Sequence, residues 1–315
     1  MVDCSSQFTL NRFARPLRPR ALSGAGAMVE QTVWCVNNDP CGICCVGVTY
    51  LLICFADFVV CTQLLVPWLG LTANCCMLCV AFLAVSGLAL ASHMRTMLTD
   101  PGAVPAEYQP ANLLHDEGAL PMCSRCNGFK PPRAHHCSQC DRCIMKMDHH
   151  CPWVNNCVGA NNQKHFVLFV GYTALMSGFA MALLGCRMMY GMAEPMHGGR
   201  DRFGYTASSS SAGRGAEQPA AVMYMLLLFF ESILFGLFTS AMMCEQLASI
   251  LGDQTGIERL KNDYAPAESK SAMRNLSETF GRPVSLLWLL PTPVRFNGLT
   301  WWDMIPLELA SPHEV

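Results

Sequence analysis

Charged residues are scarce in this chain of 315 residues: Asp, Glu, Lys and Arg make up 14% of it, whereas hydrophobic residues make up 52%. Because soluble domains carry about 25% charged residues, the deficit indicates that lipid surrounds part of the chain. A basic surplus is also lacking, since the formal net charge is −2. Proteins that bind nucleic acid neutralise phosphates with such a surplus, so the balance argues against that class of function.

A secretory signal is missing as well, because the first 28 residues contain four arginines and no apolar core. We therefore expect the N-terminus to be a cytosolic tail. The chain contains 19 cysteines, but without a signal and at this length they do not indicate a small secreted disulfide scaffold. We find no internal repeat.

The chain contains several long runs of apolar residues. Four of them approach the roughly 20 residues that an α-helix needs to cross a bilayer, and backbone groups in lipid must be hydrogen-bonded within such helices. A soluble helical bundle is the alternative, but four such runs are hard to bury without lipid. We predict an all-α polytopic membrane protein with an N-terminal tail (1–40), spans at 43–66, 71–93, 165–187 and 221–245, an insert (94–164), a loop (188–219) and a C-terminal tail (246–315).

The positions of Lys and Arg predict how the chain is oriented. Four precede the first span, seven lie between the second and third spans, and six follow the fourth span, so 17 of 21 fall on one side. The short turn expected around Pro67–Leu69 has none. The positive-inside rule therefore places both termini and the insert in the cytosol and the Gly/Ser-rich loop in the lumen.

The insert between the second and third spans is rich in metal-ligating residues. Seven cysteines and five histidines lie between Cys123 and His165. Pairs with the spacing Cys-x2-Cys can present two thiolates to one Zn²⁺, and in a reducing cytosol metal explains them better than disulfides. Two sites of three cysteines and one histidine would use six cysteines, so one cysteine is left over. We expect a zinc-binding domain built of small β-hairpins.

Cys151 has neighbours that suit a nucleophile. It ends the string Asp148-His149-His150-Cys151. A cysteine beside a histidine that a carboxylate orients has the parts of an activated thiol, because the thiolate is the reactive form. The string alone is weak evidence, but its place among the zinc-ligand spacings and between two spans makes it strong.

This region resembles a known family. The pattern C-x2-C-x9-HC-x2-C-x2-C-x4-DHHC-x5-C-x4-N-x3-F runs from Cys123 to Phe166 and resembles the cysteine-rich domain of DHHC protein S-acyltransferases, also called palmitoyltransferases. The resemblance extends to motifs outside that domain, over roughly residues 40 to 290: Asp100-Pro101-Gly102, Thr255-Gly256-Ile257-Glu258, and Asn275 with Phe280-Gly281. The sequence around Arg95–Gly102 is most similar to the Golgi-resident branch of the family, which implies a Golgi membrane.

The resemblance implies a role for each site residue. Cys151 would be the acylated nucleophile, His149 its base, and Asp148 the group that orients His149. One zinc would take Cys123, Cys126, His136 and Cys143, and the other Cys137, Cys140, His150 and Cys157. Thr255, Glu258 and Asn275 would support the motif. Gly256 replaces the second threonine of the family's TTxE motif, so any contact made by that side chain is absent.

The activity implied is that of a protein-cysteine S-palmitoyltransferase. Such an enzyme moves a palmitoyl group from acyl-CoA to its own cysteine, and then to cysteines of membrane-associated protein substrates. Lys130 and Arg133 are our candidates for the coenzyme A phosphates, with a solvated basic loop near anionic lipid as the alternative. A membrane-tethered zinc module that only recruits partners would not need a spare cysteine, and a metal transporter would need more ionisable groups in its spans. The sequence leaves open whether the chain forms a homo-oligomer.

Two carboxylates and a group of cysteines stand apart from these motifs. Asp57 and Glu231 lie inside the first and fourth spans, where a charge costs several kcal/mol. We expect structural roles for them, as neutral groups hydrogen-bonded between helices, and the alternative is that they face a polar patch near a cavity. Cysteines close to the first span are candidates for S-acylation, with inert apolar residues as the alternative: Cys35, Cys41, Cys44 and Cys45.

Overall fold

The computed structural model describes residues 39–104, 122–193, 217–262, 264 and 270–294. Most of the predicted N-terminal tail, Cys35, much of the 188–219 loop and the end of the C-terminal tail lie outside these described residues.

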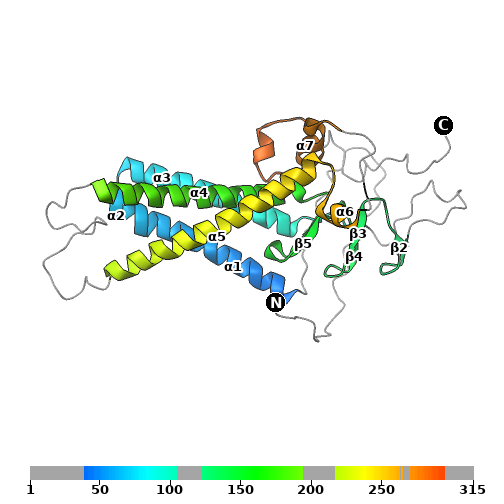
Figure 1. Ribbon diagram of the computed structural model, residues 1–315, viewed down its shortest axis with the longest axis horizontal. Helices are drawn as coiled ribbons and strands as arrows, with labels where there is room; N and C mark the ends of the chain where they lie inside the picture. Colours follow the sequence, from blue (N-terminus) through cyan, green and yellow to red (C-terminus); the bar gives the residue numbers. More distant parts are fainter. Residues whose placement is uncertain (1–38, 105–121, 194–216, 263, 265–269, 295–315) are drawn as a thin grey trace, which may run out of the picture. The chain divides into compact units, whose positions relative to one another are not determined.

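Four long helical segments make up most of the described chain (Figure 1). Each is long and apolar enough to cross a membrane. The first segment consists of three consecutive elements, α1 (Pro40–Phe58), η1 (Val59–Leu65) and α2 (Val66–Leu69). The other three are α3 (Ala73–Leu98), α4 (Gln163–Ala193) and α5 (Glu217–Leu251). The prediction of an all-α polytopic fold is confirmed.

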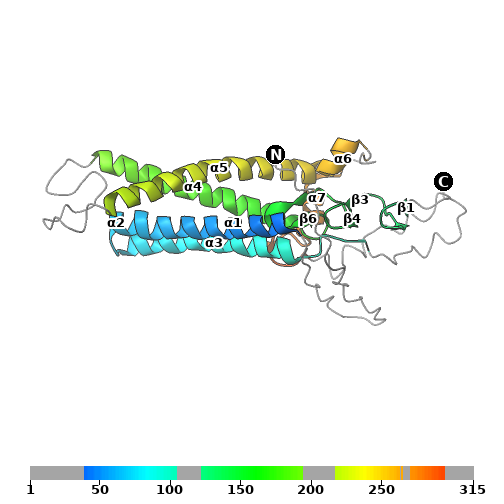
Figure 2. The same cartoon turned by 90° about the horizontal axis from the view of Figure 1, so that it is seen from below.

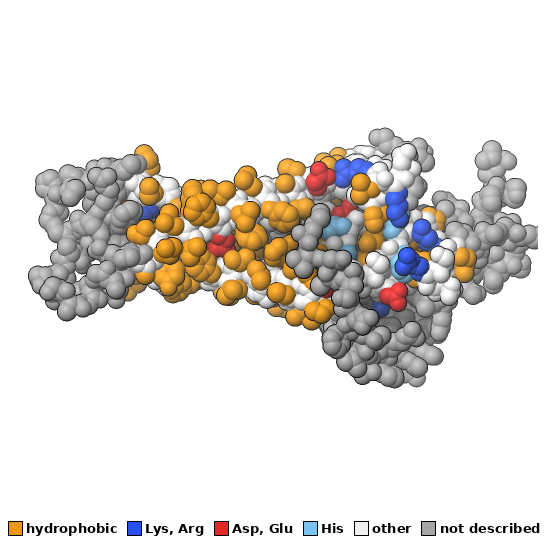
Figure 3. All heavy atoms as spheres, turned by 60° about the horizontal axis from the view of Figure 1, so that its bottom comes forward, with side chains coloured by type: hydrophobic (Ala, Val, Ile, Leu, Met, Phe, Trp, Pro, Cys, Tyr) orange, Lys and Arg blue, Asp and Glu red, His pale blue; other side chains and the backbone are white. Residues whose placement is uncertain are grey.

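The outer surface of the helices is apolar, as lipid requires. Large side chains such as Leu51, Val80, Phe230 and Leu237 are mostly exposed, and hydrophobic side chains cover the helical part of the molecule while Lys and Arg gather at the end that carries the hairpins (Figure 3). In water so large an apolar surface would be unstable. The helices also share a buried interior, which includes Val59, Leu64, Phe82, Met176 and Leu228.

The first span ends later than predicted, because Pro67 lies inside the helix. The chain stays helical to Leu69, and the reversal comes at Gly70, whose φ of 63° favours glycine. A π-helical stretch precedes the proline, and the N–H of Val66 donates to the O of Cys61. Proline has no N–H to donate, and the widened turn before it relieves the clash with the preceding turn.

The described part of the insert folds as three small antiparallel hairpins beyond the end of the helices where α3 ends and α4 begins (Figure 2). The strands are β1 (Met122–Cys123) with β2 (Gly128–Phe129), β3 (Ala134–Cys137) with β4 (Arg142–Met145), and β5 (His149–Cys151) with β6 (Asn156–Val158). Asn127, Asp141 and Asn155 have φ of 50°, 52° and 47° in the three turns. Asn and Asp tolerate this left-handed conformation better than other side chains, so each turn can be tight.

Two asparagines fasten the insert to the end of α3. The amide of Asn156 donates to the carbonyl O of Thr96, Met97 and Thr99 at 3.1, 3.2 and 3.0 Å. Asn162 donates to Thr96 O at 3.2 Å. The last carbonyls of a helix have no partner within it, so these amides both satisfy them and fix the hairpins against the membrane end of the bundle.

The chain after α5 folds back on the same end. It forms α6 (Gly256–Lys261), α7 (Ala272–Phe280) and the short helix η4 (Leu286–Leu289). Asn275 donates its amide to Leu251 O at 2.9 Å, which attaches α7 to the end of α5. Lys164 donates to Leu287 O at 2.9 Å and to Thr292 O at 3.1 Å, which attaches η4 to the start of α4.

Candidate active site and metal centres

The hairpins bring together two groups of side chains, each of three cysteines and one histidine. The first metal cluster is Cys123, Cys126, His136 and Cys143, and the second metal cluster is Cys137, Cys140, His150 and Cys157. Within each cluster, the four ligand atoms lie within 4.8 Å of one another. These are the two sets of four that the resemblance implied.

The distances within the clusters fit a tetrahedral zinc ion. Sγ to Nδ1 distances are 3.7 and 3.1 Å in the first cluster, and 3.7, 3.4 and 3.6 Å in the second. Sγ to Sγ distances are 3.8 and 3.5 Å. Zinc bonds of about 2.3 Å to sulfur and 2.0 Å to nitrogen, at tetrahedral angles, would place ligand atoms about 3.5–3.8 Å apart. The donor set of three thiols and one imidazole is also one that structural zinc uses.

The two clusters follow one spacing, which corrects our finding of no internal repeat. Each ligand of the second cluster lies fourteen positions after its counterpart in the first, and the strand pairs His136↔Cys143 and His150↔Cys157 obey the same shift. Because only the ligands and the turn residues repeat, the pattern is hard to see in the sequence. The structure makes it visible because the repeated positions fold into similar hairpins.

Cys151 occupies the place of a zinc ligand in the third hairpin. It pairs with Asn156 as Cys137 pairs with Arg142. The second cysteine of a Cys-x2-Cys pair would fall at position 154, but the residue there is Val154. The third hairpin therefore repeats the fold of the other two without a ligand pair, and its thiol stays outside both metal clusters.

Asp148, His149 and Cys151 form a connected set of acid, base and thiol. His149 Nδ1 lies 2.8 Å from Asp148 Oδ2, and His149 is hydrogen-bonded to the thiol of Cys151. Burial lowers the pKa of His149, but its bonds to Asp148 and Cys151 outweigh that effect and raise the pKa to about 9. At neutral pH the imidazole can therefore hold a proton released by the thiol.

Three donors hold the carboxylate of Asp148. His149 is one, Gln246 Nε2 donates to Oδ2 at 2.8 Å, and the backbone N–H of Gly256 donates to Oδ1 at 2.7 Å. Burial raises the pKa of Asp148, but these bonds together lower it below its ordinary value. Gln246 in α5 is a site residue that the sequence reasoning missed, because no motif marks it. Gln163 supports it in turn by donating to Gln246 Oε1 at 3.3 Å.

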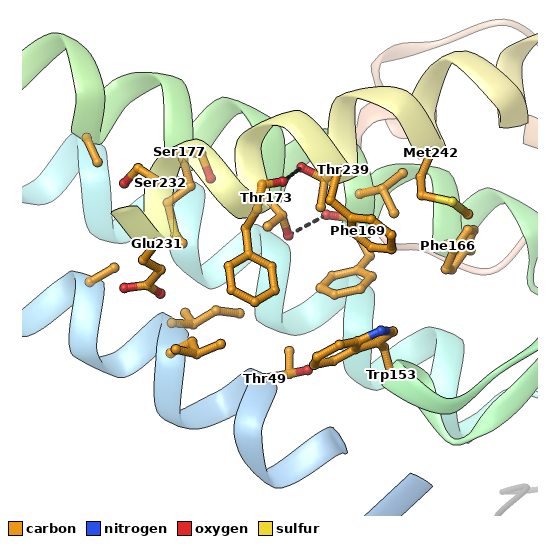
Figure 4. Close-up of a pocket in the computed structure, with 18 of the residues that line it drawn as sticks. Thr49, Trp153, Phe166, Phe169, Thr173, Ser177, Glu231, Ser232, Thr239 and Met242 are labelled. Carbon is orange, nitrogen blue, oxygen red and sulfur yellow. Dashed lines mark hydrogen bonds between the residues drawn. The ribbon is translucent and has the colours of Figure 1, made fainter. Parts of the chain in front are cut away.

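Cys151 opens onto an apolar cavity between the helices, which we call the transmembrane cavity. It contains about 790 Å³ of space between atoms, its open side included. Figure 4 shows Trp153, Phe166 and Phe169 at one end and Glu231 at the other. The residues that line it come from α1, α3, α4, α5 and the third hairpin, and they include Thr49, Ala56, Phe82, Cys151, Met176, Ala180, Phe235 and Met242.

Comparison with known proteins decides the family. A family model described as DHHC palmitoyltransferase matches residues 117–263. Palmitoyltransferase ZDHHC3 of Rattus norvegicus is 43% identical over 265 residues, which cover 82% of this chain and 83% of the relative. The chain belongs to the DHHC palmitoyltransferase family. Its predicted activity as a protein S-acyltransferase is confirmed, and an alternative that only recruits partners is not retained.

Other relatives are also acyltransferases. Palmitoyltransferase ZDHHC7 of Rattus norvegicus is 40% identical over 278 residues, which cover 85% of this chain and 84% of the relative. Probable protein S-acyltransferase 12 of Arabidopsis thaliana is 30% identical over 213 residues, which cover 64% of this chain and 67% of the relative. A DHHC enzyme acts on proteins at a membrane, which agrees with the four apolar helices.

The incomplete TTxE motif of this DHHC enzyme still contacts the acid. Thr255 Oγ1 donates to Met147 O at 2.9 Å, and Thr255 with Glu258 forms a capping box at the start of α6. Gly256 contributes its backbone N–H to Asp148 Oδ1. A Cβ atom there would meet Asp148 Oδ1 at 3.4 Å, which is a tight contact. The missing side chain therefore leaves the backbone bond to Asp148 in place.

Arg133 is engaged within the chain. Its Nε and Nη2 donate to the two carboxylate oxygens of Glu258 at 2.8 and 2.9 Å, and its Nη1 donates to Asp253 Oδ1 at 2.8 Å. Its guanidinium also lies 3.9 Å from the ring centroid of Tyr264. The structure thus gives Arg133 a part in holding α6 against the hairpins, and its predicted contact with phosphate stays a prediction. Lys130 is half-buried.

The two carboxylates within the spans differ in their surroundings. Asp57 accepts a hydrogen bond from Ser86 at 2.7 Å, which links α1 to α3. That contact supports the structural role we expected for it. Glu231 lines the transmembrane cavity instead.

The cysteines before the first span lie at the start of α1. Cys41 and Cys44 are exposed and Cys45 is half-buried. Their S-acylation stays a prediction.

Proposed function

We propose that Cys151 carries the acyl group of this protein S-acyltransferase as a thioester, with acyl-CoA as the donor. One observation carries the proposal: the thiol of Cys151 is hydrogen-bonded to His149 and also lines the transmembrane cavity. An activated sulfur is thus placed where an apolar chain can lie beside it.

The reaction consists of two exchanges of one thioester for another. The Cys151 thiolate attacks the thioester carbonyl of acyl-CoA, the bond to the coenzyme A sulfur breaks, and coenzyme A leaves as a thiol after taking the proton from His149. A substrate cysteine then gives its proton to His149 and attacks the Cys151 thioester as a thiolate, and Cys151 leaves as a thiolate. His149 holds the proton that Cys151 releases, and Asp148 positions the ring and stabilises its charge.

The transmembrane cavity would hold the acyl chain throughout. Each buried CH₂ is worth about 0.8 kcal/mol, so a palmitoyl chain gains roughly 10 kcal/mol from apolar surroundings. Little free energy changes when one thioester replaces another. The task of the protein is therefore to activate the nucleophile and to place it at the open end of an apolar cavity.

The two metal clusters would hold two structural zinc ions. Zinc bound there would contribute folding free energy, of the order of 10–16 kcal/mol per site, to hairpins too short to have a core of their own. The residues of the clusters take no part in the transfer. Their function is to fix the third hairpin, so that Cys151 faces the cavity.

We also propose how the enzyme sits in the cell. The excess of Lys and Arg supports cytosolic termini (1–40 and 246–315), a cytosolic insert (94–164) and a lumenal loop at 188–219. The branch resemblance supports the Golgi membrane. Substrates would then be membrane-associated proteins with cytosolic cysteines. Protease protection of tags at each terminus in sealed vesicles tests the orientation, and a protected terminus would contradict it.

Lys130 remains our candidate for the coenzyme A phosphates. Arg133 is the weaker one because its guanidinium already neutralises two carboxylates. Lys130→Glu should raise the acyl-CoA concentration needed for half-maximal loading, with the maximal rate retained. An unchanged concentration dependence would reject the contact.

A labelling experiment tests the proposed function. The purified protein is incubated with an acyl-CoA that carries an alkyne at its end, and the label is detected by cycloaddition. We expect label that hydroxylamine removes and that Cys151→Ser abolishes. If a folded protein with its metal takes up no label, or if Cys151→Ser is labelled equally, the proposal is wrong.

A further inference from the structure

Glu231 puts a carboxyl group into the wall of the transmembrane cavity. It is half-buried and, apart from Cys151, it is the ionisable side chain among the described residues of that wall. Its Oε2 atom is buried and has no hydrogen-bond partner among the described residues. Figure 4 shows the carboxyl group on α5, at the opposite end from Trp153 and Phe166.

Glu231 lies deep in the cavity relative to Cys151. The wall residues of α4 extend from Phe166 to Ala180, a length of about 21 Å at about 1.5 Å per residue. On α5, Glu231 lies eleven residues from Met242, or about 16 Å farther along the wall. A chain attached to Cys151 and extended along the cavity therefore brings its methyl end toward Glu231.

Three threonines of the wall have their hydroxyls engaged within their own helices. The hydroxyls of Thr49, Thr173 and Thr239 donate to carbonyl oxygens one turn earlier on their own helices, at 2.9, 2.8 and 2.6 Å. Their methyl groups can therefore face an acyl chain at little cost. The carboxyl of Glu231 differs, because covering it with a longer chain would remove it from any polar contact.

We propose that Glu231 limits the length of the acyl chain that the enzyme accepts. The inference rests on the proposed function, because it requires the acyl chain to lie in the transmembrane cavity. A chain that ends before Glu231 does not fill the space around its carboxyl group. A longer chain must press its methyl end against the carboxyl, so its loading onto Cys151 is disfavoured.

Competition among chain lengths tests this role. The purified full-length enzyme is loaded with an equimolar mixture of fourteen-, sixteen-, eighteen- and twenty-carbon acyl-CoA, and intact-protein mass spectrometry measures the chain on Cys151. Glu231→Leu should raise the ratio of twenty-carbon to sixteen-carbon loading by about tenfold, the size of effect that small changes in apolar pockets produce. Glu231→Gln keeps a polar group of the same size and should stay within about twofold of the wild type.

Glu245→Leu is the matched control, because Glu245 also lies on α5 but its side chain is 66% exposed. The control should leave the chain profile unchanged. If Glu231→Leu is not recovered folded, Glu231→Met provides the same apolar change with a more flexible side chain. An apolar variant that loads Cys151 with the wild-type profile overturns the inference alone. A wild-type enzyme that loads no chain at all overturns the proposed function instead.

Discussion

The bond between Gln246 and Asp148 offers the sharpest test of the active-site geometry. Gln246 is fully buried in α5 and donates to Asp148 Oδ2 at 2.8 Å, across 98 positions in the chain. Gln246→Leu has a similar volume but removes the donor. His149 and the N–H of Gly256 remain on the carboxylate. The variant therefore weakens the support of Asp148 without breaking its contact to the base.

The size of the effect follows from the bond that is lost. A hydrogen bond to a charged group contributes about 1.5–3 kcal/mol, which corresponds to a factor of about 10 to 150. Because two of the three donors remain, we expect the lower end, or about a tenfold slower loading of Cys151. Gln246→Glu should be slower still, because it sets a second carboxylate against Asp148 and raises the pKa of one of the two.

The assay is single-turnover loading with a labelled acyl-CoA, sampled by rapid quenching. Zinc content and thermal unfolding are measured on the same preparations, so that a slower rate can be separated from a lost fold. Glu245→Leu is again the control, since it changes the neighbouring position on an exposed side. If Gln246→Leu loads as fast as the wild type, the bond to Asp148 does not support the base.

Other changes probe separate parts of the site. His149→Ala should keep its zinc and load at least about 100-fold more slowly. His150→Ala should lose zinc, as measured by metal analysis, and equal behaviour of the two variants would refute the division of roles. Because the pKa of His149 is raised to about 9, the imidazolium should persist to alkaline pH, and the loading rate should fall only as the pH rises through about 9. A fall centred near pH 6.5 would contradict that pKa. Arg133→Leu leaves Glu258 buried without its partner and should cost about 3–5 kcal/mol, seen as a lower melting temperature. Val154→Cys restores the Cys-x2-Cys spacing beside the nucleophile, so loading should become sensitive to oxidation and recover with a reductant; insensitivity would argue against the third-hairpin equivalence.

Much of the site could be predicted because its determinants are local. Ligands in a Cys-x2-Cys pair meet within one turn, so spacing alone indicates which thiols share a metal. The leftover Cys151 and its neighbours Asp148 and His149 follow from the same short segment. The spans could be predicted because about 20 apolar residues in a row satisfy a bilayer whatever their neighbours are. The family resemblance then supplied the division of the ligands into two sets.

The ends of elements and the partners of distant groups were harder to predict. The turn expected at Pro67–Leu69 comes after Leu69, because a π-helical stretch accommodates the proline. Arg133 was a candidate for phosphate from its charge alone. The structure shows that Asp253 and Glu258, 120 and 125 positions later, already hold it.

By itself, then, the sequence predicted the membrane helices, the members of the two metal clusters and the candidate nucleophile, because apolar runs and short spacings act over a few residues. Tertiary structure decided which side chains from far along the chain meet them. Gln246 reaches Asp148, and Glu231 faces the cavity that begins at Cys151, only because α5 packs against α4 in one rotation. That rotation depends on the packing of whole helix faces. The faces of an apolar span differ little in polarity, so the sequence does not reveal which face packs against a neighbour.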